Sequence, residues 1–276
     1  MMVGILLCMS MLVRFNVPSV DTTPECRPVA AWSSVYATYG PSYDAASKKT
    51  YFTRDVDGVP GLYATGDRSS SLQACPVRSG ERSAALGYVT FAPNGDAFGV
   101  AYSMRSRQTF ATIVRLHRSA DTIVVGEPVT SLVGDFYTSC PTISPDGQLM
   151  IFATDRPGSI GTTDLWQVER QLDGSFGQPV HCGSAVNSPY AETTPRLISS
   201  DTLMFSSNGF GGQGGMDVYI SVFRNGMWQE PLPVEILNTP DDDTDAMRMP
   251  DGMFLVCRNS VQQRNRCDVW TCDPTP

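Results

Sequence analysis

Histidine is scarce in this chain of 276 residues, and basic residues are outnumbered. The histidines are His117 and His181, and 20 lysines and arginines stand against 28 aspartates and glutamates, which gives a net charge of −8. A protein that binds nucleic acid needs clustered lysine and arginine to displace counterions from the phosphates. No such cluster is visible, and we therefore expect no nucleic-acid partner.

Signatures of common catalytic and metal sites are missing too. No G-x-S-x-G motif accompanies the two histidines, so a serine hydrolase is not indicated, and we interpret both histidines as surface or packing residues. None of the eight cysteines has the C-x-x-C spacing of a zinc site. From the sequence we assign no catalytic residue, no cofactor and no metal ligand.

The N-terminus carries an apolar run, but not a long one. Residues 3–13 are too few to cross a bilayer as a helix, yet they match the hydrophobic segment of a secretory signal. Val17 and Ser19 are small residues that suit cleavage before Val20. No lysine or arginine precedes the run, so a retained anchor or a mis-assigned start codon is the alternative.

These features predict the domain organisation and the location of the protein. We expect residues 1–19 to be a signal peptide or an N-terminal anchor, and residues 20–276 to form a single domain. Lipid attachment at Cys8 is disfavoured because Leu7 stands where a small residue is needed. The protein is then exported to the periplasm or cell surface of a bacterium, and it meets a membrane only through a possible N-terminal anchor.

Helical periodicity is absent after residue 20, and a repeat of strand type takes its place. Short β-branched and aromatic segments recur at intervals of about 50 residues, and most follow a turn of Pro-Asp-Gly character. The segments are KTYFTRD (49–55), AFGVAYS (97–103), LMIFATD (149–155), TLMFSSN (202–208) and MFLVCRN (253–259). A period of this length with several short strands per unit is typical of a β-propeller.

The third and fourth units each contain four strand-like segments. In the third unit these are PTIS (141–144), LMIFATD, DLWQV (164–168) and FGQPV (176–180), and the fourth unit repeats the order. Asn225-Gly226 and Asp173-Gly174 suit tight hairpins, because both central residues can adopt positive φ. Each unit is therefore expected to form one four-stranded antiparallel blade.

The fifth unit lacks its outer strand. It ends with CDVWTC (267–272), whereas ECRPVAAW (25–32) resembles the outer strands of other units. We therefore predict an all-β fold, a five-bladed β-propeller in which the N-terminal strand completes the last blade and removes the open sheet edges. Six blades are the alternative.

Closure of the ring makes a disulfide prediction possible. If 267–272 runs antiparallel to the strand that begins at Cys26, Cys272 and Cys26 lie within bridging range. Cys257 and Cys267 are a second candidate pair, because they lie on adjacent strands that flank one loop. Buried free thiols are the alternative. The pairing of three further cysteines is left open; these are Cys75, Cys140 and Cys182.

Two motifs that look like ligand sites have simpler explanations. Gly209, Gly211 and Gly214 form a G-x-G-x-x-G, but a strand follows them instead of the helix that a dinucleotide site needs, so we assign them to a hairpin loop. An acidic cluster lacks the glycine and glutamate of an EF-hand, and we interpret it as a solvated loop. Its members are Asp241, Asp242, Asp243 and Asp245.

An aspartate precedes the third strand in three units, at Asp164, Asp217 and Asp268. We expect each to hydrogen-bond the backbone of the preceding loop, while the aromatic residue two positions later packs between blades.

The turn and loop motifs together resemble a known repeat. Ser-Pro-Asp-Gly (144–147), Phe-Ser-Ser-Asn (205–208), Gly-Gly-x-Gly-Gly (211–215) and Asp-Val-Tyr (217–219) resemble the WD40-like β-propeller repeats of bacterial envelope proteins, the TolB-like group. The resemblance extends over roughly residues 26–272. TolB itself has six blades, so the five blades predicted for this chain are a departure from the family pattern. The resemblance implies an exported, non-enzymatic platform for protein contacts.

On this basis we expect a monomeric protein-interaction scaffold of the cell envelope, with other envelope proteins as partners. Loops after the second strands and loops between blades open on one face, and loops on a rigid scaffold usually carry function. This face would carry Arg54, Asp55, Arg156, Glu192, Asn208, Asp245 and Arg258. The alternative is a carbohydrate-active hydrolase or a ligand-binding propeller with its site in the central channel, where separate blades can present paired carboxylates.

Overall fold

The computed structural model describes residues 25–32, 34–66, 70–105, 108–119, 121–260 and 267–274. The expected signal segment with Cys8 lies outside these residues. The regular structure in the described ranges consists of β-strands and two 3-10 helices, η1 (Ala30–Trp32) and η2 (Thr130–Leu132). No helix within those ranges is both long enough and apolar enough to cross a membrane.

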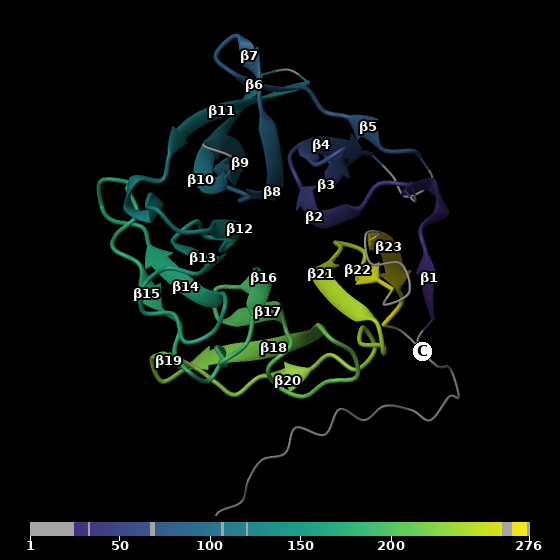
Figure 1. Ribbon diagram of the computed structural model, residues 1–276, viewed down its shortest axis with the longest axis vertical. Helices are drawn as coiled ribbons and strands as arrows, with labels where there is room; N and C mark the ends of the chain where they lie inside the picture. Colours follow the sequence, from purple (N-terminus) through teal and green to yellow (C-terminus); the bar gives the residue numbers. More distant parts are fainter. Residues whose placement is uncertain are drawn as a thin grey trace, which may run out of the picture.

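Five sheets stand around a common axis (Figure 1). The strands nearest the axis are β2 (Thr38–Asp44), β8 (Ala85–Phe91), β12 (Thr138–Ile143), β16 (Glu192–Ser199) and β21 (Asp242–Arg248). The second strands are β3 (Lys49–Val56), β9 (Ala97–Arg105), β13 (Leu149–Thr154), β17 (Thr202–Ser207) and β22 (Phe254–Asn259). The prediction of a five-bladed propeller is confirmed, and the alternative of six blades is wrong.

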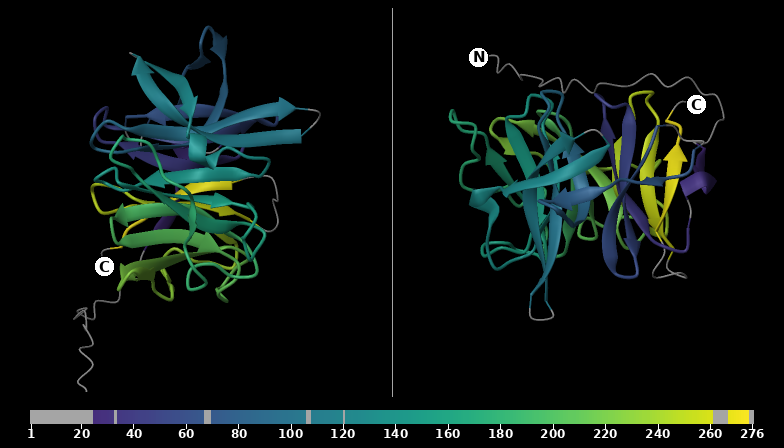
Figure 2. Two further views of the ribbon diagram at one scale, coloured as in Figure 1. Left: turned by 90° about the vertical axis from the view of Figure 1, so that its left-hand side faces the viewer. Right: turned by 90° about the horizontal axis from the view of Figure 1, so that it is seen from above.

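The remaining strands complete each blade toward the rim. The third strands are β4 (Val59–Thr65), β10 (Gln108–Ser119), β14 (Asp164–Glu169), β18 (Asp217–Arg224) and β23 (Cys267–Cys272). The outer strands are β5 (Gln73–Ala74), β11 (Thr122–Pro128), β15 (Val180–His181), the pair β19 (Met227–Trp228) and β20 (Leu232–Pro233), and β1 (Cys26–Pro28). Seen from the side, the strands run between the two faces of the ring (Figure 2).

We number the blades 1 to 5 in the order in which their inner strands occur in the chain. Two of them depart from the simple four-stranded pattern. Blade 2 is extended by the hairpin of β6 (Val77–Ser79) and β7 (Arg82–Ser83), and β6 pairs with β11 in parallel. In blade 4 the outer strand is divided into β19 and β20, which both pair with β18. The segment between them contains Pro231, which has no backbone N–H to donate to β18.

The last blade is closed by the N-terminal strand, as predicted. β1 pairs with β23 in an antiparallel register that sets Cys26 opposite Cys272, and Figure 1 shows the two strands side by side. A disulfide joins these two cysteines. The predicted closing bridge is therefore confirmed.

The second predicted bridge is wrong, because Cys257 and Cys267 are free thiols. Cys257 faces Val269, and Cys267 faces Asn259, so the two cysteines are diagonal neighbours on β22 and β23 and not a directly opposed pair. The remaining cysteines of the described residues are free as well; these are Cys75, Cys140 and Cys182.

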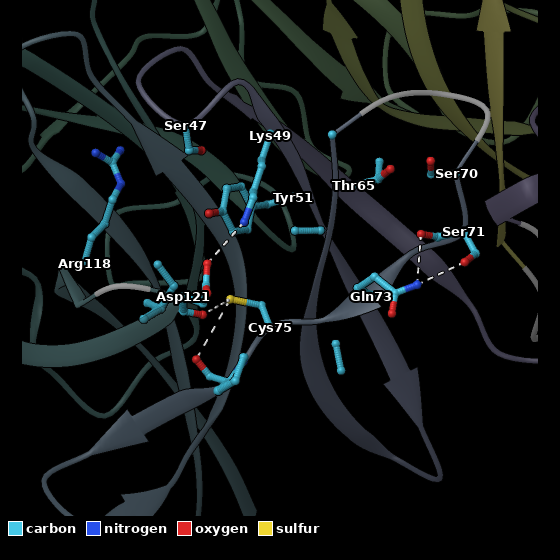
Figure 3. Close-up of a pocket in the computed structure, with 15 residues that line it drawn as sticks. Ser47, Lys49, Tyr51, Thr65, Ser70, Ser71, Gln73, Cys75, Arg118 and Asp121 are labelled. Carbon is cyan, nitrogen blue, oxygen red and sulfur yellow. Dashed lines mark hydrogen bonds and ion pairs between the residues drawn. The ribbon is translucent and has the colours of Figure 1, made fainter.

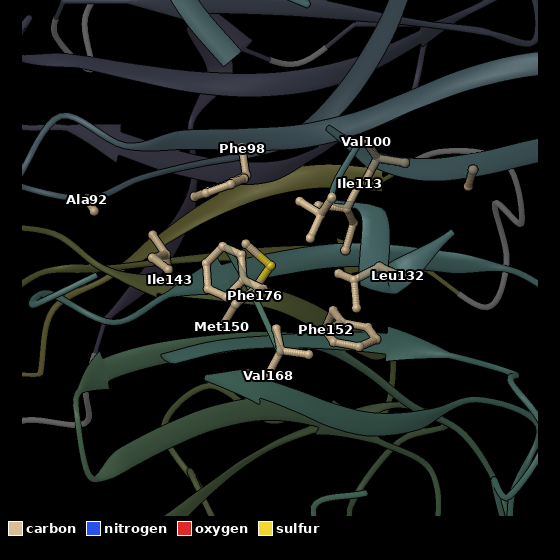
Figure 4. Packing of buried hydrophobic residues seen from close by; sticks show 12 residues of the cluster. Ala92, Phe98, Val100, Ile113, Leu132, Ile143, Met150, Phe152, Val168 and Phe176 are labelled. Atoms are coloured by element: carbon tan, nitrogen blue, oxygen red, sulfur yellow. The ribbon is translucent and has the colours of Figure 1, made fainter. Parts of the chain in front are cut away.

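The hydrophobic core lies between neighbouring blades, in five clusters. Strand β13 shows how the repeated segment produces it. Met150 and Phe152 enter the cluster shared with blade 2, whereas Ile151 and Ala153 enter the cluster shared with blade 4. Figure 4 shows the first of these clusters. Because the second strand is buried on both faces, it is recognisable as a continuous apolar run.

The aspartates before the third strands act as predicted in the two cases that the hydrogen bonds describe. Asp164 accepts hydrogen bonds from the backbone N–H groups of Ile160 and Gly161. Asp217 does the same for Gln213 and Gly214. The glycines of the G-x-G-x-x-G motif therefore belong to a loop that leads into strand β18, and the motif is not a dinucleotide fingerprint.

Candidate functional site

Every inner strand carries a β-bulge at the same level of the channel. The pairing register shifts between Tyr39 and Ser42 in β2, and corresponding shifts occur in β8, β12, β16 and β21. In each strand the first residue inside the shifted interval has positive φ; the five residues are Gly40, Tyr88, Cys140, Thr194 and Asp245. We call this ring of five residues the waist.

Four of these five residues adopt a left-handed conformation without being glycine. Their φ angles range from 45° at Tyr88 to 55° at Asp245. The left-handed conformation costs roughly 1–2 kcal/mol per residue, and for a β-branched residue such as Thr194 it is a genuine outlier. Strain of this kind gathers at functional sites. The waist is therefore the candidate functional site.

The waist is nearly closed. The cavity that reaches it has a volume of about 10 Å³ and is lined by four of its side chains and their neighbours on β8, β12 and β16. A volume of about this size holds one water molecule at most. The channel is therefore divided into two separate mouths, one on each face of the ring.

Asp245 is the carboxylic acid of the waist, and it is 5% exposed. Burial raises its pKa to about 6, although Thr244, Arg196 and a backbone hydrogen bond at Gly40 favour the ionised form. The Thr244 hydroxyl lies 3.0 Å from Asp245 Oδ2. An aspartic acid with this pKa keeps part of its protons near neutral pH, as a general acid must.

Four tyrosines lie close to one another at the end of the channel where the inner strands start. We call this end of the channel the tyrosine mouth. The four residues are Tyr39, Tyr88, Tyr102 and Tyr137. The rings of Tyr39 and Tyr88 lie 5.2 Å apart. Burial raises the pKa of all four, and the charge of Asp245 adds to this for three of them. The four phenols are neutral hydrogen-bonding groups close to the buried carboxyl.

A second carboxylate lies at the same mouth. The charge of Asp55, in β3, contributes to the raised pKa of Tyr39, and one Asp55 oxygen accepts a hydrogen bond from Gly58 N–H at 2.7 Å. Asp155 is also near, but its oxygen holds the backbone N–H of Tyr137 at 2.7 Å. The mouth thus combines a buried acid with a partly exposed carboxylate.

Cys140 is the thiol of the waist. Its Sγ lies 3.5 Å from the Ser139 hydroxyl, and burial together with the charge of Asp245 raises its pKa to about 11. A thiol rather than a thiolate is therefore present at neutral pH, and Cys140 lacks the activation that a cysteine nucleophile needs.

A polar groove of about 790 Å³ lies away from the channel, between blades 1 and 2 (Figure 3). Lys49 and Asp121 form an ion pair across it at 3.6 Å. Cys75 donates weakly to the carbonyl of Asp121 at 3.8 Å, and burial raises its thiol pKa. Asp121 is the sole carboxylate among the lining residues. Among the described residues the groove therefore presents one carboxylate, whereas glycoside cleavage needs two.

Three arginines of the predicted binding face stack on aromatic rings of their own blades. Arg54 lies over Tyr63, Arg156 over Trp166 and Arg258 over Trp270, at 4.9, 5.4 and 4.7 Å from the ring centroids. Arg258 also pairs with buried Asp243 at 2.6 Å. Arg156 and Arg258 are buried. Their role is to join the second strand of a blade to the third.

The other predicted residues of that face are also used within the protein. Glu192 is fully buried and accepts hydrogen bonds from the hydroxyls of Ser188 and Ser207. Asn208 is exposed, and its side chain accepts a hydrogen bond from Ala191 N–H. With Asp245 and two of the arginines buried as well, the structure does not assemble the seven residues into one exposed surface.

The interpretation of residues 241–245 as a solvated acidic loop is wrong. Asp243 is fully buried and Asp245 nearly so, and both belong to strand β21. Asp242 accepts a hydrogen bond from Met216 N–H at 3.0 Å. Within the described ranges, no group of three or more histidines, cysteines, aspartates or glutamates is arranged to hold a metal ion.

The two histidines lie outside the channel. His181 contacts buried Asp164 at 2.7 Å and packs edge-on against Trp166, and His117 is exposed. The interpretation as packing and surface residues is confirmed.

The tyrosines, Cys140 and Arg196 escaped the sequence analysis. A signal was present in three units, where a proline follows the waist residue directly at Pro41, Pro141 and Pro195. An alignment of the units on this proline would have placed Gly40, Cys140 and Thr194 at the waist, with Tyr39 directly before it. The first strand of blade 2 lacks the proline, so Tyr88 was not detectable in this way.

Comparison by sequence identifies no relative: no protein-family model matches the chain, and no curated protein matches it. Solved structures do match. A thermostable family-43 glycoside hydrolase is 11% identical with a TM-score of 0.59, over 88% of this chain and 90% of that chain. An endo-arabinase from Bacteroides thetaiotaomicron is 15% identical with a TM-score of 0.57, over 90% and 95% of the two chains.

A putative TolB from Agrobacterium tumefaciens matches more weakly. It is 15% identical over 88% of this chain and 76% of that chain, with a TM-score of 0.47. This value is too low to support an argument. The propeller arrangement implied by the resemblance to WD40-like repeats is present, and its assignment to the TolB-like group rests on the sequence motifs alone.

These comparisons overturn the prediction of a non-enzymatic scaffold. Glycoside hydrolases and arabinofuranosidases recur among the similar structures, which agrees better with the alternative of a carbohydrate-active hydrolase. At identities of 9% to 15% the similarity shows the fold alone. The activity must therefore be argued from the residues of this chain.

Proposed function

We propose that the protein is a glycoside hydrolase that binds its substrate at the tyrosine mouth and uses Asp245 as general acid. The observation that carries this proposal is the position of Asp245, a buried carboxyl held in a left-handed conformation at the waist beside Tyr39 and Tyr88. The similarity of the fold to glycoside hydrolases supports the choice of reaction.

The reaction needs a protonated carboxyl group and a second carboxylate. The first gives its proton to the leaving glycosidic oxygen, and the second activates water or attacks the sugar. The raised pKa of Asp245 suits the first role. Asp55, on the same mouth, is the carboxylate that we assign to the second.

The tyrosines suit a carbohydrate because they combine apolar faces with polar tips. Sugar rings pack their C–H faces on aromatic rings, and sugar hydroxyls exchange hydrogen bonds with phenols. Tyr137 is 40% exposed and is therefore available to incoming substrate. Tyr39 and Tyr88 lie deeper, next to Asp245.

The test is hydrolysis by the purified protein of 4-nitrophenyl glycosides, beginning with arabinofuranosides and xylosides, and of arabinan. Asp245→Asn is expected to lower kcat by about 10²–10⁴, because general acid catalysis contributes that much. Tyr39→Phe is expected to act mainly on KM. Asp146→Asn is the matched control, because Asp146 lies in the exposed turn between β12 and β13.

Two results would contradict the proposal. One is hydrolysis that Asp245→Asn leaves unchanged, because the proton would then come from elsewhere. The other is the absence of both cleavage and binding across the panel, measured by product release and by a glycan array.

We further propose that the protein is exported and that its repeat is related to the WD40-like repeats of envelope proteins. The disulfide between Cys26 and Cys272 supports export, since such bonds persist in oxidising compartments. Expression in a bacterial host followed by fractionation tests this: the protein should be recovered outside the cytoplasm with residues 1–19 removed.

A further inference from the structure

A funnel opens on the face opposite the tyrosine mouth, where the inner strands end. Its volume is about 280 Å³. Each of the five inner strands contributes the residue two positions beyond its waist residue; these are Ser42, Thr90, Thr142, Arg196 and Met247. The nearly closed waist lies between this funnel and the tyrosine mouth, and Arg196 lines both the funnel and the small cavity at the waist.

The charge of the funnel is opposite to that of the whole protein. Arg196 and Arg248 line it, and no aspartate or glutamate does, although the chain has a net charge of −8. Neither arginine forms an ion pair within 4.0 Å with another described residue. Two guanidinium groups without a close ion-pair partner in one cavity favour an anionic ligand.

Arg196 is held in place for such a ligand. Its Nη2 donates a hydrogen bond to the carbonyl of Pro41 at 2.6 Å, which spans the channel from blade 4 to blade 1. Its Nε is buried and has no hydrogen-bond partner among the described residues. Burial lowers the pKa of Arg196, and the nearby Asp245, Cys140 and Cys257 act in the opposite direction. An anion in the funnel would supply the close ion-pair partner that Arg196 lacks among the described residues.

The rest of the lining determines which anion fits. Phe91, Tyr43 and Ile143 form an apolar wall, and Thr142 Oγ1 accepts a hydrogen bond from Leu197 N–H at 3.0 Å, which leaves its own proton to donate. An inorganic ion would leave the apolar wall uncovered in a cavity of this size. We propose that the funnel binds a compact organic carboxylate, with its carboxylate on Arg196 and Arg248 and its apolar body on the wall of Phe91, Tyr43 and Ile143.

The test is isothermal titration of the purified protein with benzoate, with benzamide as neutral match and inorganic phosphate as simple anion. Benzoate is expected to bind, and benzamide at least tenfold more weakly. Arg248→Gln should raise the Kd for benzoate about tenfold, the loss of roughly one charge-assisted contact. Arg248 is exposed, so this variant should fold even if Arg196→Gln does not. Arg224→Gln, at the exposed last residue of β18, is the matched control and should leave the Kd unchanged.

Three results would overturn the inference. They are equal binding of benzoate and benzamide, a Kd for benzoate that Arg248→Gln does not alter, and binding of phosphate without binding of benzoate. Asp245→Asn removes a negative charge near Arg196, so this variant should bind benzoate at least as tightly as the unaltered protein. Loss of hydrolysis in that variant would therefore not affect the outcome, and the two proposals fail separately.

Discussion

Replacing Cys26 and Cys272 by serine should lower the stability of the ring by about 5 kcal/mol. The disulfide joins residues separated by 246 positions, so it closes almost the whole described chain into one loop. In the chain-entropy account, a loop of this length restrains the unfolded state by about 5 kcal/mol at 25 °C. For a domain of this size that corresponds to a fall in Tm of roughly 10 °C.

The structure locates where the loss acts. β1 is short and pairs with β23 through three residue pairs, so the bridge and the burial of Val29 and Trp32 after β1 share the task of retaining the closing strand. Trp32, which follows β1 and is 1% exposed, reports on its release. Tryptophan fluorescence during urea unfolding should therefore show a lower midpoint for the double serine variant and for the reduced protein.

The control is Cys75→Ser, which removes a free thiol on the rim and should leave the midpoint unchanged. If the double variant, the reduced protein and the oxidised protein unfold within about 0.5 kcal/mol of one another, the bridge does not stabilise the closure, and the reasoning from loop length is refuted.

Three further predictions follow from single residues. Asp217→Ala leaves the N–H groups of Gln213 and Gly214 without their acceptor and should lower the free energy of unfolding by about 2–4 kcal/mol. Asp173→Ala, in an exposed turn, is the control and should leave the free energy of unfolding unchanged. Equal Tm values for the two variants in thermal melts would contradict this. The pKa of Asp245 is about 6 when folded and 3.8 as a reference, so its contribution to stability is fully present below pH 3.8 and is lost as the pH rises through 6. Asp245→Asn lacks this loss, and denaturant titrations between pH 4 and 7 should show it gaining about 3 kcal/mol relative to the unaltered protein; parallel curves would contradict the burial of the charge. Alkylation of the native protein should modify Cys75 ahead of the buried thiols Cys140, Cys182 and Cys257, as peptide mass spectrometry will show; rapid labelling of Cys257 would place β22 at the surface.

The sequence predicted the fold well because the repeat is a direct consequence of packing. A second strand buried on both faces must be apolar along its whole length, as in Met150, Ile151, Phe152 and Ala153, and that run is visible in every unit. Closure of the ring was also predictable, because the last blade lacks an outer strand and the N-terminal segment has the pattern of one. The bridge between Cys257 and Cys267 failed because a loop of unknown register lies between them.

The candidate site was much less predictable. Positions after the second strands look like exposed loop ends in sequence, yet Arg156 and Arg258 fold back over Trp166 and Trp270 and become buried. The waist was not predicted, because each blade contributes one residue to it and these five residues are of five different types. Gly40 and Asp245, for example, lie beside each other in space. Periodicity identifies what the blades share, whereas a site at the axis depends on how they differ.

The most direct measurement of the central claim is the rate of glycoside hydrolysis by the purified protein and by its Asp245→Asn variant, followed from pH 4 to pH 8. The account predicts cleavage at the tyrosine mouth that falls as the pH rises through about 6, with kcat reduced at least about a hundredfold in the variant. Equal rates for the two proteins across this range would show that Asp245 is not the proton donor and that the waist is not the active site.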